Sequence, residues 1–183
     1  MSERFDLIVI GAGSAARDAA NTAARKHAAR VALIEKERWG GSCPNVACQP
    51  TKAYLVAAEL AHDVNTLAPR IGVEAGRASV DLARLHAWKE ALKKPQEQWI
   101  EELRAKGYAT YPGEARLIDS HTLQVGDDVL EADRVLIASG SRTAVPPIDG
   151  LEQVGWLDHV SALELTELPE SMLVVGEIGR AHV

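Results

Sequence analysis

The chain has 183 residues, of which 46% are hydrophobic and 25% charged, and its formal net charge is −6. This length suffices for one domain with a real core and the start of another. The acidic balance excludes the basic face that nucleic-acid binding needs. Because no apolar run reaches about 18 residues, we expect no membrane-spanning segment. No signal-peptide core precedes the first glycine turn, so we expect a cytoplasmic protein, in which stable structural disulfides are uncommon.

The N-terminal part of the chain predicts one strand–turn–helix–strand unit. Residues 5–10 are apolar, as in a strand buried on both faces, and a Gly-rich turn follows at residues 11–16. The Ala-rich segment 15–30 favours a helix. Residues 31–34 form a second buried strand that ends on Glu35. The whole stretch has the size of one parallel βαβ unit, which is about 30 residues.

The rest of the chain predicts further helices and short strands. A helix is expected from Pro44 onward, and Pro95 divides a long amphipathic segment at residues 80–106. Apolar runs predict strands at residues 108–111, 122–125, 129–131, 134–138 and 172–175. The expected fold class is α/β: a Rossmann-like domain with a parallel sheet, flanking helices and a small antiparallel β excursion at residues 108–131.

The turn after the first strand has the pattern of a dinucleotide-binding site. Gly11 permits a tight turn, and Gly13 lets the backbone approach a pyrophosphate. Ser14 and Ala15 open the following helix, whose N-terminal N–H groups bind anions without any basic side chain. Glu35 stands 22 residues after Gly13, where an acid accepts hydrogen bonds from a ribose. The alternative is a tight structural turn with no ligand.

Two cysteines, Cys43 and Cys48, stand only five positions apart. In an ideal helix their sulfurs would be poorly placed to bond, so a disulfide here needs a distorted helix start or a loop. Strain of that kind makes a disulfide easier to reduce, and a helix N-terminus favours the reactive thiolate. The alternatives are two buried free thiols or a metal site. A closed zinc site needs four ligands, and neither His27 nor His62 stands at a ligand-like interval.

The segment from Gly41 to Lys52 resembles the active-site signature of the class I pyridine nucleotide–disulfide oxidoreductases, a family that includes mercuric reductase and dihydrolipoamide dehydrogenase. The turn at residues 11–16 with Glu35 is similar to the start of the family's FAD-binding domain. Similar segments also occur at residues 113–115, which touch the adenosine in the family, and at 138–141. Residues 173–176 resemble the first strand of the nicotinamide domain.

This resemblance implies a flow of electrons from NAD(P)H through FAD to a Cys43–Cys48 disulfide and on to a small-molecule or metal-ion substrate. Cys43 would meet the substrate and Cys48 would lie against the flavin. Lys52 would approach the flavin edge, and Ser42 would help to hold the pyrophosphate. The resemblance further implies a homodimer for the full-length protein and the following cofactor-binding residues: Gly11, Gly13, Ser14, Ala15, Glu35, Lys36, Gly41, Ser42, Lys52, Ala115, Ser139 and Gly140. The family's catalytic His–Glu pair matches no residue here, so His86 and His121 receive no role.

The substrate stays open between mercuric ion and dihydrolipoamide or another disulfide. The pair Ala15-Ala16 in the Gly-rich turn is similar to the same turn in mercuric reductases. Ala47 stands where the family usually has glycine. Two other readings also stay open. The first is an NAD-binding Rossmann protein with incidental cysteines. The second is a catalytically incomplete flavin-binding fragment.

We expect three parts along the chain. Residues 1–146 would form the FAD-binding domain with its redox-active cysteine pair, and residues 147–171 a linker. Residues 172–183 would start a truncated NAD(P)-binding domain. One back-translation of residues 177–183 resembles a DNA-sequencing adapter, so we expect the natural sequence in this chain to end near Gly176 and the remainder to be read-through. The chain alone is then expected not to complete a catalytic cycle.

Overall fold

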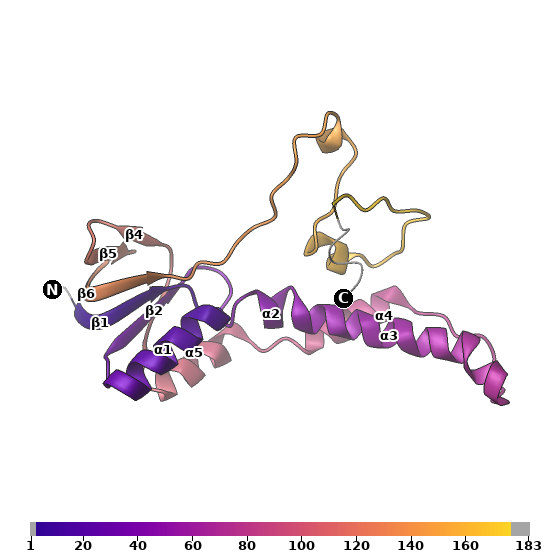
Figure 1. The fold of residues 1–183 in the computed structure, drawn as a ribbon, viewed down its shortest axis with the longest axis horizontal. Helices are drawn as coiled ribbons and strands as arrows, with labels where there is room; N and C mark the ends of the chain where they lie inside the picture. Colours follow the sequence, from indigo (N-terminus) through magenta and orange to yellow (C-terminus); the bar gives the residue numbers. More distant parts are fainter. Residues whose placement is uncertain (1–2, 177–183) are drawn as a thin grey trace.

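The computed structural model describes residues 3–176 and contains one six-stranded sheet in the order β3-β2-β1-β6-β5-β4 (Figure 1). Strand β1 pairs in parallel with β2 and β6, and β2 pairs in parallel with β3. Strand β5 pairs antiparallel with β4 and β6. The expected α/β class is confirmed. The strands are β1 (Glu3–Ile10), β2 (Val31–Glu35), β3 (Ala109–Pro112), β4 (Ala115–Leu117), β5 (Thr122–Val125) and β6 (Asp128–Ile137).

Two helices cover one face of the sheet. These are α1 (Ser14–His27) and α5 (Gln96–Ala105). Val9 and Leu33 point from the strands toward this face, where they form one core with small α1 residues and with Leu103 of α5. Ala16 and Ala20 stand four residues apart on α1 and are fully buried. Their small side chains let α1 approach the sheet closely, because residues at this spacing share one helix face.

The opposite face of the sheet carries a second core. Ile8 and Ile34 alternate with the residues of the first core along their strands, as the two-residue period of a strand requires. They pack with residues of the antiparallel part of the sheet, Leu123, Leu130 and Ala132. The continuous apolar runs of β1 and β2 are therefore explained by burial on both faces.

A pair of helices extends away from the sheet (Figure 1). The short α2 (Ser42–Asn45) leads into α3 (Cys48–Thr66), which lies beside α4 (Leu82–Ala91). A 3-10 helix, η1 (Ala68–Ile71), turns the chain between them. The predicted division at Pro95 is confirmed, because α4 ends before this residue and α5 begins directly after it.

Three expectations about the strands up to residue 138 were wrong. Residues 108–111 were expected in the antiparallel excursion, but β3 pairs in parallel with β2. The two strands expected at 129–131 and 134–138 are one strand, β6, because β1 pairs along both halves. The second half of β6 was expected to be buried, yet Ile137 is 65% exposed.

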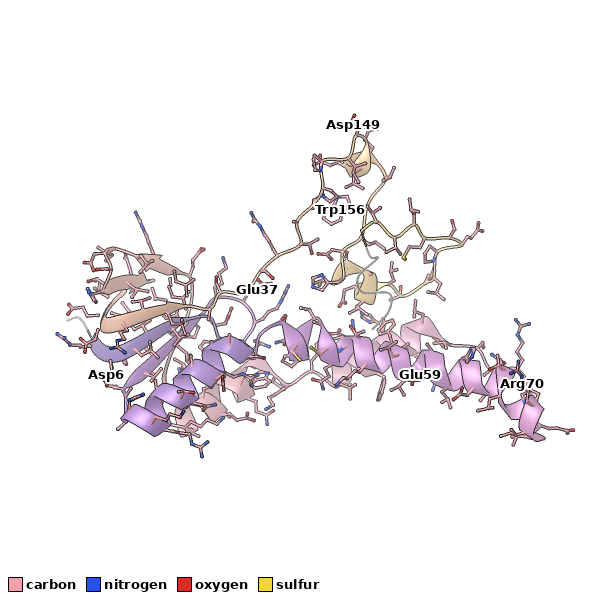
Figure 2. The ribbon with its side chains drawn as sticks, viewed as in Figure 1. Asp6, Glu37, Glu59, Arg70, Asp149 and Trp156 are labelled. Carbon is pink, nitrogen blue, oxygen red and sulfur yellow. The ribbon has the colours of Figure 1, made fainter. Side chains whose placement is uncertain are left out.

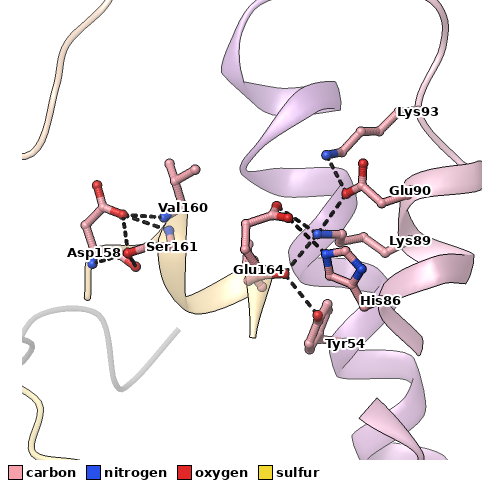
Figure 3. A network of polar contacts seen from close by, with 10 residues as sticks. Tyr54, His86, Lys89, Glu90, Lys93, Asp158, Val160, Ser161 and Glu164 are labelled. Atoms are coloured by element: carbon pink, nitrogen blue, oxygen red, sulfur yellow. Dashed lines mark hydrogen bonds and ion pairs between the residues drawn. The ribbon is translucent and has the colours of Figure 1, made fainter. Parts of the chain in front are cut away.

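The chain after β6 leaves the sheet and returns to the helix pair (Figure 1). It contains two 3-10 helices, η2 (Leu151–Gln153) and η3 (Ser161–Glu164), and η3 meets the buried Lys89 of α4 (Figure 3). The strand expected at residues 172–175 is absent, and these residues form neither helix nor strand. The predictions for residues 177–183 lie outside the described residues. Among residues 3–176, every helix is too short or too polar to cross a membrane.

Candidate functional site

The predicted dinucleotide turn lies at the carboxyl edge of the parallel strands. The sequence order of the strands reverses at β1, since β2 lies on one side of it and β6 on the other. Ligands of open α/β sheets bind at such a switch point. Gly11 follows β1 with a φ of +118°, and a Cβ there would lie 2.3 Å from the Ala138 carbonyl oxygen. Ser139 and Gly140 follow Ala138 just after the end of β6, so they lie at the same edge of the sheet as Gly11.

Helix α1 begins at this edge without a side-chain cap. Gly13 is its N-cap and forms no capping hydrogen bond, and its first turn holds no acidic residue. Ser14 and Ala15 are exposed. The N–H groups of the first helical turn therefore lack an intrahelical acceptor and attract a negatively charged group. This is the arrangement that a pyrophosphate needs.

Glu35 holds the turn together from the end of β2. Its carboxylate accepts hydrogen bonds from the backbone N–H groups of Ala12 at 3.1 Å, Glu37 at 2.9 Å and Arg38 at 3.1 Å. A carboxylate has about four acceptor positions, so Glu35 keeps capacity for a ribose hydroxyl. Figure 2 marks Glu37 in the loop between the sheet and the helix pair.

The segment before Ala115 runs beside the end of β2. The Gly113 N–H donates to the Glu35 carbonyl oxygen at 3.0 Å. Lys36 forms an exposed ion pair with Glu114 at 3.1 Å. The structure thus brings Lys36 and the segment that leads into Ala115, both predicted to bind the cofactor, next to the end of β2.

The loop before the cysteines touches the dinucleotide turn through backbone atoms. A Cβ on Gly41 would lie 2.5 Å from the Cα of Gly13, and the φ of Gly41 is +77°. No side chain fits between the two glycines. The dinucleotide turn and the cysteine loop are separate in the sequence but adjacent in the structure. Ser42 and the cysteine pair therefore start beside the dinucleotide turn, and the two motifs form one site.

The two cysteines lie on either side of a break in the helix. Helix α2 ends before Val46, and α3 starts at Cys48. The N–H groups of Val46 and Ala47 both donate to the Ser42 carbonyl oxygen, at 2.8 Å and 2.9 Å. This break between the helices is the kind of distorted helix start that a disulfide between the two cysteines would need. Both thiols are free here; Cys43 is half-buried and Cys48 is exposed.

The Cys43 thiol holds its proton more tightly than an ordinary cysteine. The pKa of Cys43 is raised, first by the hydrogen bond between its side chain and Cys48, then by burial and by the charge of Cys48. The positive charge of Lys52, one turn into α3, acts in the opposite direction.

The residues at this edge fit a flavin dinucleotide. The uncapped start of α1 offers backbone N–H groups to the pyrophosphate. Gly13 and Gly41 carry no side chain that would keep a ligand away from their backbone. Glu35 has a free acceptor position for a ribose hydroxyl. Ser42, Cys48 and Lys52 are exposed at the beginning of α2 and α3. Together, the fold and the site define a dinucleotide-binding α/β protein with a dithiol next to the nucleotide turn.

Comparison with known proteins identifies the family. The model of the family described as pyridine nucleotide-disulphide oxidoreductase matches residues 5–178, and the chain belongs to this family. Its members are FAD-dependent and take electrons from NAD(P)H, so the cofactors expected from the sequence are those of the family.

The relatives include two kinds of enzyme. A mercuric reductase of Staphylococcus aureus is 38% identical over 177 residues, covering 94% of this chain and 31% of the relative. A dihydrolipoyl dehydrogenase of Haloferax volcanii is 33% identical over 180 residues, covering 93% and 37%. The solved structure of the HOCl-induced flavoprotein disulfide reductase RclA from Escherichia coli matches with a TM-score of 0.70 and 29% identity, covering 90% of this chain and 35% of RclA. The chain thus spans about a third of the length of these relatives.

Sequence analysis missed three residues that contact the loop before the cysteines. Asn45 lies between the cysteines but received no role, although it is buried. Gln96 and Trp99 stand on α5, far away in sequence. For Gln96 the only local signal was Pro95, which marks a helix start and so places Gln96 in a first turn. No motif connects that turn to the cysteines.

Proposed function

We propose that this chain is the flavin- and disulfide-bearing part of an oxidoreductase. In the whole protein, electrons from NAD(P)H would reach a Cys43–Cys48 disulfide through FAD and then pass to a metal ion or to a disulfide or dithiol substrate. The observation that carries the proposal is the backbone contact between Gly13 and Gly41. It supports a direct approach of the cysteine loop to a dinucleotide bound at the turn.

The residues of the sheet edge would hold the nucleotide. The pyrophosphate would lie at the start of α1 near Gly13, with Gly41 and Ser42 facing it from the second loop. Glu35 would bind the ribose, with Lys36 and Ala115 toward the adenosine. The remaining residues assigned to the cofactor are Gly11, Ser14, Ala15, Lys52, Ser139 and Gly140. When bound, FAD supplies the ability to accept a hydride and to reduce an adjacent disulfide.

The two thiols would have different tasks. Cys48, which is exposed at the first residue of α3, suits the position against the flavin. Cys43, whose raised pKa keeps it in the thiol form to higher pH, suits the exchange with substrate. It must lose its proton to attack, because the thiolate is the nucleophile. Among residues 3–176 we assign no base to this step.

The relatives indicate the substrate classes. Mercuric reductase and dihydrolipoyl dehydrogenase are named for a metal ion and for a dithiol substrate. We extend either class to this chain, together with a homodimer for the whole protein and a cytoplasmic location. We keep the proposed division into an FAD-binding domain at 1–146, a linker at 147–171 and the start of an NAD(P)-binding domain at 172–183.

The proposal is tested by cofactor content and thiol state. Purified chain supplied with FAD should be yellow and should release FAD on denaturation. After mild oxidation, alkylation and mass spectrometry should find no free thiol, and reduction should restore both. The variants Cys43→Ser and Cys48→Ser should each retain FAD but keep one free thiol throughout. A colourless protein that binds NAD, or two free thiols after oxidation, would contradict the proposal.

The chain alone is proposed to bind FAD without turnover. It spans about a third of the length of its relatives, and this supports the reading of an incomplete flavin-binding unit. NADPH oxidation coupled to mercuric-ion or disulfide reduction should be no faster with the chain than with the same concentration of free FAD alone. Cysteine-dependent turnover by the chain alone would show that it is catalytically complete.

A further inference from the structure

Asn45 and Gln96 join the loop before the cysteines to the first turn of α5. The Asn45 amide nitrogen donates to the carbonyl oxygens of Gly41 at 2.7 Å and Trp39 at 3.1 Å. Its amide oxygen accepts from the Gln96 Nε2 at 3.1 Å. The Gln96 Oε1 in turn accepts from the Trp39 N–H at 2.6 Å. The two side-chain amides thus close a ring of hydrogen bonds around residues 39–45.

A second contact from the same helix supports this loop. Trp99 stands three residues after Gln96, so both lie on one face of α5. A Cβ on Gly40 would lie 2.7 Å from the Trp99 ring, and the φ of Gly40 is +91°. Two cations lie over the Trp99 ring: the Arg17 guanidinium carbon is 4.9 Å and the Lys94 Nζ 4.1 Å from its centroid. The loop therefore meets α5 at two points.

The supported loop connects the two halves of the site. Gly41 contacts Gly13 of the dinucleotide turn, and Cys43 follows two residues later. Asn45 is only 7% exposed, so its hydrogen bonds have no easy replacement by water. Any shift of residues 39–45 moves Cys43 relative to Cys48, which α3 carries separately.

We propose that Gln96 is a positioning residue for the Cys43–Cys48 pair. It contacts neither cysteine, and it acts through Asn45 and the Trp39 backbone. Disulfide bonding tolerates only a narrow geometry, so a loop held in place keeps the two sulfurs close and favours the bond. This inference rests on the proposed redox role of the pair and adds to it a residue outside the cysteine signature.

Two substitutions separate the contacts of Gln96. Gln96→Ala removes both hydrogen bonds. Gln96→Glu keeps an acceptor for the Trp39 N–H but loses the donor to Asn45, so its effect should be intermediate. Gln98→Ala is the matched control, because Gln98 is exposed on the same helix and forms no side-chain hydrogen bond among the described residues.

The measurement is the equilibrium between the cysteine pair and dithiothreitol, read as the disulfide fraction by alkylation and mass spectrometry at 25 °C. Reduced dithiothreitol takes the disulfide to two thiols and is itself oxidised to its cyclic disulfide. Gln96→Ala should lower the equilibrium constant for the Cys43–Cys48 disulfide by about tenfold, since a freer loop lowers the effective concentration of one thiol for the other. Gln96→Glu should lower it less, and Gln98→Ala should leave it unchanged.

Thermal melts of each variant show whether it is folded under these conditions, and Gln96→Glu carries the test if Gln96→Ala unfolds. If both Gln96 variants have a disulfide equilibrium constant within twofold of the wild-type value, or above it, the positioning role is overturned. The proposed function would still stand in that case, because the wild-type chain forms the disulfide. If the wild-type chain forms no reversible disulfide, the proposed function fails, and the positioning role fails with it.

Discussion

The close approach of the cysteine loop to the dinucleotide turn depends on Gly41. Its φ of +77° and ψ of −165° belong to a region that is essentially open only to glycine. A side chain there would also meet the Cα of Gly13. Both the cysteine loop and the dinucleotide turn would have to move to accommodate it.

We therefore expect Gly41→Ala to lower the free energy of unfolding by at least about 2 kcal/mol and to weaken FAD binding. Urea unfolding and titration with FAD measure the two effects. Gly72→Ala is the control, because Gly72 has a φ of +81° but no atom within 4 Å of its added Cβ. It should cost about 1 kcal/mol and leave FAD binding intact. Equal effects of the two substitutions would show that the Gly13 contact is unimportant.

Lys52 sets part of the proton affinity of the cysteine pair. Its charge lowers the pKa of Cys43, against the larger upward effects of the Cys48 hydrogen bond and of burial. Lys52→Met should therefore raise the pKa of Cys43 further and move the midpoint of its alkylation to higher pH. Peptide-resolved mass spectrometry after brief iodoacetamide treatment follows Cys43 by itself. Lys26→Met, at the far end of α1, is the control, and a profile for Lys52→Met that matches it would refute this role of Lys52.

At the scale of elements, the docking of η3 on the helix pair depends on one buried cation. The Lys89 side chain is fully buried, and its Nζ lies 2.8 Å from carboxylate oxygens of both Glu90 and Glu164. It also donates to the Leu163 carbonyl oxygen at 2.9 Å, which the Tyr54 hydroxyl reaches at 3.0 Å (Figure 3). His86 lies 2.9 Å from Glu164. Burial alone would lower the pKa of Lys89, but its hydrogen bonds to the two carboxylates outweigh this and raise it.

This cluster makes the docking sensitive to acid. Burial acts to raise the pKa of Glu164, but hydrogen bonds from Lys89 and His86 outweigh it and lower the pKa below its ordinary 4.5. A lowered carboxyl pKa stabilises the docked state above the ordinary value and loses that contribution as the pH falls through the lowered one. Hydrogen exchange of the η3 amides, corrected for intrinsic rates, should therefore show loss of protection below about pH 4.5.

Glu164→Gln should weaken protection at neutral pH and remove most of its dependence on pH. Since Glu164 is partly exposed, we expect a cost of only about 1 kcal/mol after allowing for solvent screening. Glu152→Gln on η2 is the matched control and should behave as wild type. Unchanged acid sensitivity in Glu164→Gln would assign the effect to another group.

The local sequence pattern predicted the strands that are buried on both faces and the helix that is buried on one. It failed for the elements whose position depends on which distant strand or loop they contact. The apolar runs and the Ala-rich segment predicted β1, α1 and β2 because both faces of the strands and one face of the helix are buried. Strand β3 was assigned to the wrong part of the sheet, since four residues carry no signal for the partner they choose. Likewise Gln96 reaches Asn45 across 51 positions, a contact that arises only when α5 packs beneath the loop.

At the scale of the whole molecule, the sheet and the helix pair meet at the proposed site. The carboxyl edge of the sheet offers the dinucleotide turn, and α2 and α3, which carry the cysteines at their near ends, begin beside this edge and extend away from it (Figure 1). The family motifs account for the residues on this edge, whereas the supporting contacts of α5 come from the packing of the fold. The central claim is that bound FAD and the cysteine pair form one electron-carrying unit.

An anaerobic titration with dithionite tests that claim most directly. The chain with bound FAD should accept four electrons per flavin, two for the flavin and two for the Cys43–Cys48 disulfide. Cys43→Ser, with the same FAD content, should accept only two. If the wild-type chain also accepts only two electrons, or if the variant still accepts four, the cysteines and the flavin do not work as one unit and the account is contradicted.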